Sequence, residues 1–238
     1  MTGKLILTLL WPEICPFCGR VFRQGICFQC QRKLKRLEIG EPKCMKCGKP
    51  VRHAQQEYCH DCVQTQHYFD KGAALWIHKE PVNMSIYQYK FHGQRWFGKY
   101  YAREMAERYG SVLMKWKPDM ILPIPLHRAK LRKRGYNQAA IVSKELGRLM
   151  EIPVNMKIFK RVRMTNPLKN LNPAQRKKNL RKAFAVADGG RKKLAGKTIL
   201  LVDDIYTTGS TMDEAAKTLK NAGVEKVFYL TISIGQGY

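Results

Sequence analysis

Two neighbouring carboxylates and four serine or threonine hydroxyls fall within the thirteen residues 199–211, which read ILLVDDIYTTGST. The acid pair is Asp203 and Asp204, and the residues after it that concern us are Thr207, Thr208, Gly209, Ser210 and Thr211. Backbone N–H groups and hydroxyls at the start of a helix can hold a phosphate, and a glycine allows it close approach. Adjacent carboxylates can accept hydrogen bonds from sugar hydroxyls. A helix cap by Ser210 or Thr211 with Glu214 is the simpler alternative, but it explains only one hydroxyl. The segment predicts a phosphate-and-ribose binding loop.

The eight cysteines form a second group with chemical potential, because each belongs to a C-x-x-C pair within the first 62 residues. The residues are Cys15, Cys18, Cys27, Cys30, Cys44, Cys47, Cys59 and Cys62. The spacings are C-x2-C-x8-C-x2-C and then C-x2-C-x11-C-x2-C. Two pairs of thiolates on tight knuckles complete a tetrahedral Cys₄ shell, so we predict two zinc ions. Such closed sites are structural, and their module is expected to stabilise the protein or to offer a docking surface.

Two alternatives exist for the cysteines. A disulfide framework belongs to secreted domains, and we expect no signal peptide here, because the apolar stretch 5–11 lacks a cleavage site. We expect that stretch to pack on the zinc module. A redox C-x-x-C is also possible in principle, but four such pairs in succession are unusual for it.

Basic residues follow the apolar segment 119–125 (DMILPIP) and include Arg128, Lys130 and Arg134. A basic loop at this place suits a polyphosphate, although a solvated charged loop explains the same composition. Asn137 and Gln138 are expected either in that loop or at the start of a helix. A segment over 190–198 imitates a Walker A motif, but its spacing is one residue too long and it leads into a strand, so we reject it.

Alternating apolar strands and amphipathic helices are predicted from about residue 69 onward. We expect strands over 72–78, 119–124, 198–203 and 227–233, and helices over 82–89, 96–114, 137–150 and 211–222. This order predicts a mostly parallel sheet with helices on both faces. We therefore expect a zinc module over 1–66 and an α/β domain over 67–238. The basic segment 160–183 is predicted to be a mobile flap over the site, with a nucleic-acid contact or a plain linker as alternatives.

The thirteen-residue segment resembles the signature with which type I phosphoribosyltransferases bind phosphoribosyl pyrophosphate (PRPP). Further motifs occur in a fixed order: YKFHG at 89–93, PIPL at 123–126, RGYNQ at 134–138 and Arg176-x-x-Asn179. Together with the cysteine pairs, they resemble the ComF family of competence-associated phosphoribosyltransferase-like proteins over nearly the whole chain. The resemblance implies that Asp203 and Asp204 meet the ribose hydroxyls and that residues 207–211 hold the 5′-phosphate. It also implies that Arg128, Lys130 and Arg134 face a pyrophosphate with Mg²⁺, with Lys90 at the rim.

The resemblance leaves three functions open. The first is a PRPP-binding protein that handles imported single-stranded DNA during natural transformation, alongside a DNA-uptake helicase or channel proteins. The aromatic residues Tyr87, Tyr89, Phe91 and Trp96 then suit base stacking, although helical spacing also suits a core. The second is an active phosphoribosyltransferase of nucleotide metabolism or salvage, but Thr207 stands where some purine-specific relatives have an acid. The third is a PRPP-responsive regulator that binds duplex DNA, for which no helix-turn-helix is evident.

Charge favours a polyanionic partner. The chain has 238 residues with 44 Lys and Arg against 18 acidic residues, a net charge of +26. Two zinc ions bound by eight thiolates still leave about +22. Nucleic acid is the expected partner and an anionic membrane surface the lesser alternative. No apolar run reaches the roughly 18 residues of a membrane span, so we expect a cytoplasmic protein, with the inner membrane face as an alternative location.

Overall fold

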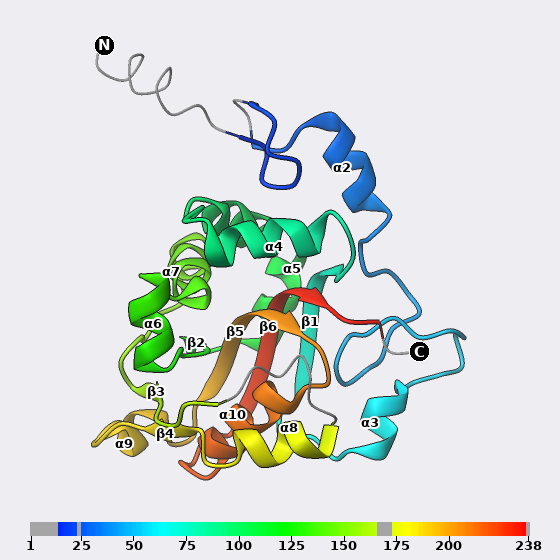
Figure 1. Cartoon of the computed structure of the whole chain (residues 1–238). Helices are drawn as coiled ribbons and strands as arrows, with labels where there is room; N and C mark the ends of the chain where they lie inside the picture. The colour runs from blue at the N-terminus through cyan, green and yellow to red at the C-terminus, as the bar shows by residue number, and fades with distance from the viewer. Residues whose placement is uncertain (1–13, 23–24, 166–172, 237–238) are drawn as a thin grey trace.

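A four-stranded parallel sheet forms the centre of the computed structural model, which describes residues 14–22, 25–165 and 173–236. The strands lie in the order β1, β6, β5, β2 (Figure 1). Their bounds are β1 Lys71–Ile77, β2 Met120–Pro123, β5 Thr198–Tyr206 and β6 Lys226–Ile234. Every neighbouring pair is parallel, which brings the carboxyl ends of all four strands to one edge.

Side chains of the central strands alternate between two apolar cores. In β5, Ile199 and Leu201 point into one core, while Leu200 and Val202 point into the other. All four side chains are fully buried, which explains the continuous apolar run in the sequence. A sheet that is buried on both faces needs a helical layer on each.

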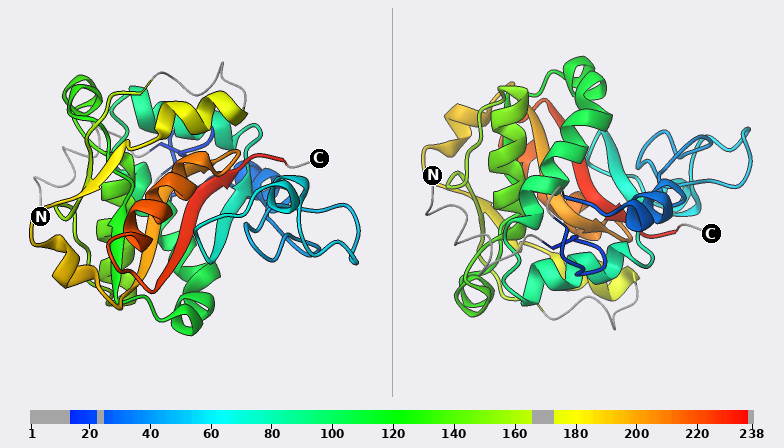
Figure 2. Two further views of the ribbon diagram at one scale, coloured as in Figure 1. Left: turned by 90° about the horizontal axis from the view of Figure 1, so that it is seen from below. Right: turned by 90° about the horizontal axis from the view of Figure 1, so that it is seen from above.

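Helices supply both layers, as the sequence predicts (Figure 2). One face carries α4 (Val82–Phe91), α5 (Phe97–Trp116) and α7 (Gln138–Met150). The opposite face carries α10 (Ser210–Lys220), with α8 (Pro173–Leu180) beside it. None of the helices within the described residues is long and apolar enough to cross a membrane.

Several elements differ from the sequence-based expectations. The strand expected over 198–203 extends to Tyr206, so the acid pair lies inside β5. The prediction that the basic residues after β2 form a loop is wrong, because Arg128–Arg134 form the helix α6 with His127 as its N-cap residue. The short strands β3 (Phe159–Arg161) and β4 (Phe184–Val186), and the helix α9 (Gly190–Leu194), were not expected. Residues 166–172 of the predicted flap lie outside the described residues.

The cysteine-rich region packs directly on the edge strand β1. It includes the unexpected short helices α2 (Phe28–Lys35) and α3 (His60–Gln64). The N–H groups of Gly72 and Ile77 donate to the carbonyls of Lys46 and Leu37, at 2.9 and 2.8 Å. The strand edge is thereby covered, which prevents pairing with another chain. The stretch 5–11, which we expected to pack here, lies outside the described residues.

Candidate functional site

The acid pair occupies the carboxyl-terminal part of β5, where open α/β sheets bind ligands. Both carboxylates are partly buried. The Asp203 carboxylate accepts a hydrogen bond from the N–H of Asp204 at 2.9 Å. The Asp204 carboxylate lies 2.8 Å from the ammonium of Lys90, which comes from the last turn of α4. The predicted rim residue Lys90 therefore contacts the acid pair directly.

The pKa of Asp203 reflects this crowding. Burial first, and then the adjacent charge of Asp204, raise this pKa from 3.8 to about 7. The hydrogen bond from Asp204 and the charges of Lys90 and Arg161 act against this rise. Near neutral pH the Asp203 carboxyl can thus both donate and accept hydrogen bonds, which suits a sugar hydroxyl.

The phosphate loop, residues 207–211, connects β5 to α10. Gly209 is the N-cap residue and has a φ of 80°, in the left-handed region that glycine adopts without strain. A Cβ at Gly209 would also collide with the ring of Tyr206. The hydroxyls of Thr208 and Ser210 lie 3.0 Å apart. The first N–H groups of a helix have no partner within that helix, so these hydroxyls and the start of α10 can form a cradle for an anion.

A cluster of cations faces the acid pair, and it comes from three separate segments. Lys90 lies in the last turn of α4, Lys130 and Arg134 lie four residues apart on α6, and Arg161 ends β3. Burial lowers the pKa of Arg134, while the charges of Asp204 and Asp203 oppose that lowering. The pKa of Lys130 is lowered by burial and then by the neighbouring Arg161 and Arg134. Lys90, Arg134 and Arg161 thus interact with the acid pair, and Lys130 joins them through Arg134 and Arg161. Such a group of cations suits a multiply charged anion.

Arg161 was not singled out from the sequence. Its guanidinium donates to the Thr165 hydroxyl at 2.5 Å and lies over the Phe184 ring. Its Nε is buried without a hydrogen-bond partner among the described residues. Burial lowers its pKa and the charge of Asp203 acts in the opposite sense. The only sequence signal was its place in a long basic segment.

The predicted residue Arg128 lies at the edge of this cluster. It is exposed at the start of α6 and lines a pocket with Leu131 and Val162, to which Arg161 of the cluster also contributes. It stands two residues before Lys130, so the helical turn directs the two side chains to different sides.

Hydrogen bonds fix the segments that carry Lys90 and Arg134 to each other. The Tyr136 hydroxyl donates to the carbonyl of Tyr89, and the Tyr89 hydroxyl donates to the carbonyl of Gln138 at 2.8 Å. Tyr89 is fully buried, so it belongs to the core and not to a stacking surface. Of the four aromatic residues considered for base stacking, Tyr87 and Phe91 are exposed, and their ring centroids are 5.1 Å apart.

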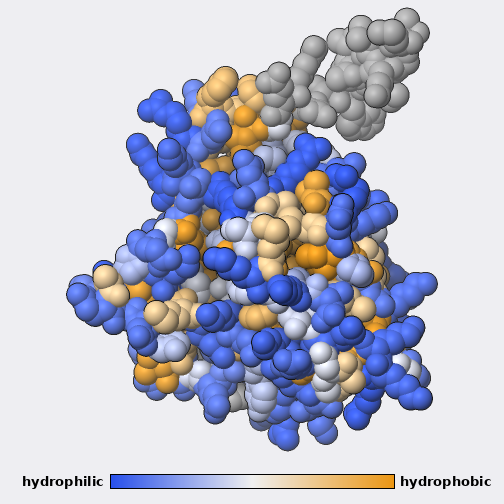
Figure 3. Space-filling view, turned by 180° about the vertical axis from the view of Figure 1, so that it is seen from behind, coloured by the Kyte–Doolittle hydropathy of each residue, from blue (hydrophilic) through white to orange (hydrophobic). Residues whose placement is uncertain are grey.

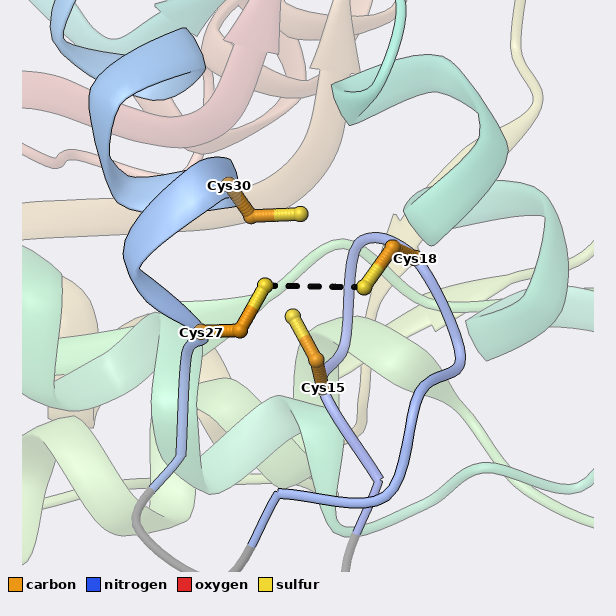
Figure 4. Close-up of side chains that lie close together, drawn as sticks. All are labelled: Cys15, Cys18, Cys27 and Cys30. Carbon is orange, nitrogen blue, oxygen red and sulfur yellow. Dashed lines mark hydrogen bonds between the residues drawn. The ribbon is translucent and has the colours of Figure 1, made fainter.

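The first cysteine set has the geometry of a zinc site. Cys15 and Cys18 come from a knuckle, and Cys27 and Cys30 from the start of α2 (Figure 4). The four sulfurs lie within 4.8 Å of one another. The Cys18 and Cys27 sulfurs are 3.6 Å apart. A tetrahedral zinc with bonds of about 2.3 Å holds its sulfurs about 3.8 Å apart, whereas a disulfide requires about 2.05 Å. The side chains therefore fit a structural zinc ion.

The second set, Cys44, Cys47, Cys59 and Cys62, meets the same condition. The sulfurs of Cys47 and Cys59 are 3.5 Å apart. The carbonyl of Cys47 also accepts a 2.7 Å hydrogen bond from the Tyr229 hydroxyl on β6. The Tyr229 ring stacks on Tyr206 at 4.8 Å, and Tyr206 supports the phosphate loop at Gly209. A continuous series of contacts thus joins the second zinc site to the phosphate loop.

Comparison with protein families gives two matches along the chain. A double zinc ribbon domain matches residues 6–63, and a phosphoribosyl transferase domain matches residues 97–233. The first match covers both cysteine sets, so we call residues 14–37 the first ribbon and residues 38–64 the second ribbon. The second match covers the acid pair, the phosphate loop and most of the cation cluster.

Relatives match over almost the whole length. Competence protein F of Haemophilus influenzae is 33% identical over 210 residues, covering 87% of this chain and 89% of that protein. DNA utilization protein YhgH of Salmonella typhimurium is 27% identical, with 91% and 94% covered. Competence protein ComFC of Bacillus subtilis is 24% identical, with 84% and 80% covered. Motifs, domain matches and relatives agree that the chain belongs to the ComF family of phosphoribosyltransferase-like proteins with an amino-terminal double zinc ribbon.

Proposed function

We propose that the protein binds PRPP with Mg²⁺ and acts in DNA uptake, where it handles imported single-stranded DNA in the cytosol. The observation that carries the first part is the acid pair of β5, which stands between the phosphate loop and a cluster of four cations. A phosphoribosyl ligand has the same sequence of groups: a 5′-phosphate, sugar hydroxyls and a pyrophosphate.

Each part of the ligand then has a partner of matching chemistry. Asp203 and Asp204 accept from the ribose hydroxyls, and the phosphate loop receives the 5′-phosphate. Lys90, Lys130, Arg134 and Arg161 neutralise the pyrophosphate. Mg²⁺ binds hard oxygen ligands and keeps several waters, so pyrophosphate and hydroxyl oxygens with one carboxylate suffice for it.

The proposed DNA role rests on different observations. Relatives over nearly the full length are named for competence and DNA utilization. The net charge of +26 favours a polyanion. Tyr87 and Phe91 are exposed beside the cation cluster, with the Arg134 guanidinium 5.0 Å from the Phe91 ring centroid. Exposed rings among cations suit sequence-independent stacking of bases.

Calorimetric titration with Mg²⁺–PRPP tests the site. We expect saturable binding by the parent protein, and a loss of at least about tenfold in affinity when both Asp203→Asn and Asp204→Asn are made. The matched control is Asp188→Asn, an exposed acid beyond β4. Unchanged affinity in the double variant would show that the ribose is not held by the acid pair.

An active phosphoribosyltransferase is the second candidate function. The specific observation in its favour is the cation cluster, because four positive side chains could stabilise departing pyrophosphate. Release of pyrophosphate from Mg²⁺–PRPP, measured over a panel of nucleobases, distinguishes turnover from binding. A turnover that depends on one base and is lost in the Arg161→Met variant would establish this candidate.

A further inference from the structure

A cavity of about 620 Å³ lies between the second ribbon and the phosphate loop. Its ribbon wall includes Lys49, Arg52 and Gln56, and its opposite wall includes Thr207 and Thr208. The chain that leaves β6 runs toward the second ribbon (Figure 1), and residues 235–236 also line the cavity. None of the four cations of the cluster lines this cavity. It is therefore a separate space that adjoins the phosphate loop.

The chemistry of the cavity suits an anionic, hydrogen-bonding ligand. Lys49 is only 3% exposed, and its ammonium lies 2.6 Å from the Asp61 carboxylate and 5.7 Å from the Tyr206 ring centroid. Among the charged side chains that line the cavity, Lys49 and Arg52 are basic and Asp61 is acidic. Gln56 adds an amide. Because Asp61 and the Tyr206 ring both hold the buried Lys49 side chain, its position is defined, unlike that of a solvated surface lysine.

The size of the cavity exceeds what a terminal phosphate needs. Binding pockets for small molecules have volumes of roughly 300–1,000 Å³, so one further nucleotide fits this space. A 5′-monophosphate or PRPP would leave it unfilled, because its 5′-phosphate ends at the phosphate loop. A phosphodiester at the phosphate loop would extend into the cavity. One of its ester oxygens leads to the sugar at the acid pair, and the other leads to the preceding nucleotide.

We infer that this cavity binds the nucleotide that precedes the phosphate loop, so that the whole site takes the 3′ end of a single strand. The inference rests on the proposed function and adds its substrate class. The strand end follows from the acid pair: Asp203 and Asp204 accept from sugar hydroxyls, and inside a DNA strand the 3′ oxygen is esterified. Only the last sugar of a strand offers a free 3′ hydroxyl.

Two variants test the cavity from opposite walls. Gly235→Leu fills it, because a Cβ there would make only ordinary contacts, 3.8 Å from the Thr207 Cα. Arg52→Glu reverses the charge of the ribbon wall. The matched controls are Gly40→Leu, where a Cβ meets nothing within 4 Å, and Arg191→Glu on α9, away from the second ribbon (Figure 1).

The probe is a single-stranded hexathymidylate with fluorescein at its 5′ end, followed by anisotropy at about 150 mM salt, where contacts to phosphates alone are weakened. We expect Gly235→Leu and Arg52→Glu each to weaken its binding about tenfold and the controls less than twofold. Mg²⁺–PRPP should displace the probe from the parent. A strand ending in 2′,3′-dideoxythymidine should bind about tenfold more weakly, because it lacks the 3′ hydroxyl.

The outcomes separate this inference from the proposed function. If PRPP does not bind the parent, the proposed function fails. If PRPP binds, but neither cavity variant weakens the probe more than its control, the inference fails alone. If the dideoxy strand binds as well as the normal one, the assignment to a strand end is overturned. If Gly235→Leu weakens PRPP binding as well, the inference is judged from the probe affinity of Arg52→Glu compared with that of Arg191→Glu.

Discussion

At the residue scale, the decisive feature is that Asp203 and Asp204 are neighbours in a partly buried place. Burial and the second charge raise the pKa of Asp203 to about 7, although Lys90 lies 2.8 Å from Asp204. A carboxyl whose folded pKa is raised favours folding most at low pH. That advantage decreases as the pH rises toward the folded value. The acid pair thus costs stability at neutral pH, as functional sites often do.

Asp203→Asn removes this cost. In the unfolded chain the aspartate has a pKa of about 3.9, so its ionisation penalty in the folded protein grows from about pH 4 to pH 7 and then levels off. We expect the variant to gain stability over the parent, by on the order of 1 kcal/mol more at pH 8 than at pH 6. Urea unfolding at both values measures this. A gain that is equal at pH 6 and pH 8 would contradict the raised pKa.

At the element scale, α7 begins at a residue with two tasks. The Asn137 side chain accepts from the N–H of Ala139 at 3.1 Å and so caps the helix. Its amide also donates to the carbonyl of Ile124 at 3.0 Å, just beyond β2. The alternative of a helix start, left open by the sequence, is the one observed. This contact fixes the segment from β2 to α7, which includes α6 and its cations.

Asn137→Ala should therefore destabilise the protein and loosen the site together. Loss of an N-cap and of a partly buried hydrogen bond is expected to cost about 1–2 kcal/mol in urea unfolding. Affinity for Mg²⁺–PRPP should fall as well, because Lys130 and Arg134 lose their support. The control is Asn221→Ala, at the exposed end of α10, for which a change within about 0.5 kcal/mol is expected. Equal effects of the two variants would show that the cap is unimportant.

At the scale of the whole molecule, the ribbons and the α/β domain form one body. The second ribbon bonds to β1, and Cys47 accepts from Tyr229, which stacks on Tyr206 below the phosphate loop. Loss of the zinc ion from the second ribbon should therefore disturb the phosphate loop.

Hydrophilic residues cover most of the face seen in Figure 3, with apolar groups in smaller patches. Together with the net charge of +26, this surface suits loose contact with a polyanion.

We expect Cys59→Ser to reduce bound zinc from two ions per chain to one and to weaken PRPP binding by a few-fold. That loss should be smaller than the one in the Asp203→Asn, Asp204→Asn double variant, because the ribbon acts on the loop only through Tyr229 and Tyr206. Cys18→Ser is the control, because it removes the other zinc and leaves these contacts in place. Metal analysis and calorimetry report both quantities. Greater harm to PRPP binding from Cys18→Ser than from Cys59→Ser would refute the coupling.

Salt separates the two proposed ligands. Single-strand binding should weaken on the order of tenfold or more between 50 and 200 mM salt if about four phosphates are contacted. PRPP binding should change less, since it depends on a few directed contacts at the acid pair and the phosphate loop. Anisotropy and calorimetry at both salt concentrations measure the difference. Equal salt dependence would indicate that PRPP, too, is held only by diffuse charge.

The sequence alone determined the features that adjacent residues create. The acid pair and the phosphate loop are contiguous from Asp203 to Thr211, so one strand followed by one helix suffices to build them. The two cysteine sets were predicted for the same reason, because each knuckle needs only a C-x-x-C pair. The parallel sheet followed from buried strands that alternate with helices.

Only the tertiary structure decided which distant residues meet at those features. Lys90 and Asp204 are separated by more than a hundred residues of sequence, and Arg161 joins them from a strand that the sequence did not predict. Arg128 is only two residues from Lys130, yet its side chain points to a different side because α6 is a helix where a loop was expected. The cavity beside Arg52 exists because the second ribbon packs on β1. Such meetings depend on how helices, strands and ribbons pack, and no local pattern of residue types encodes that packing.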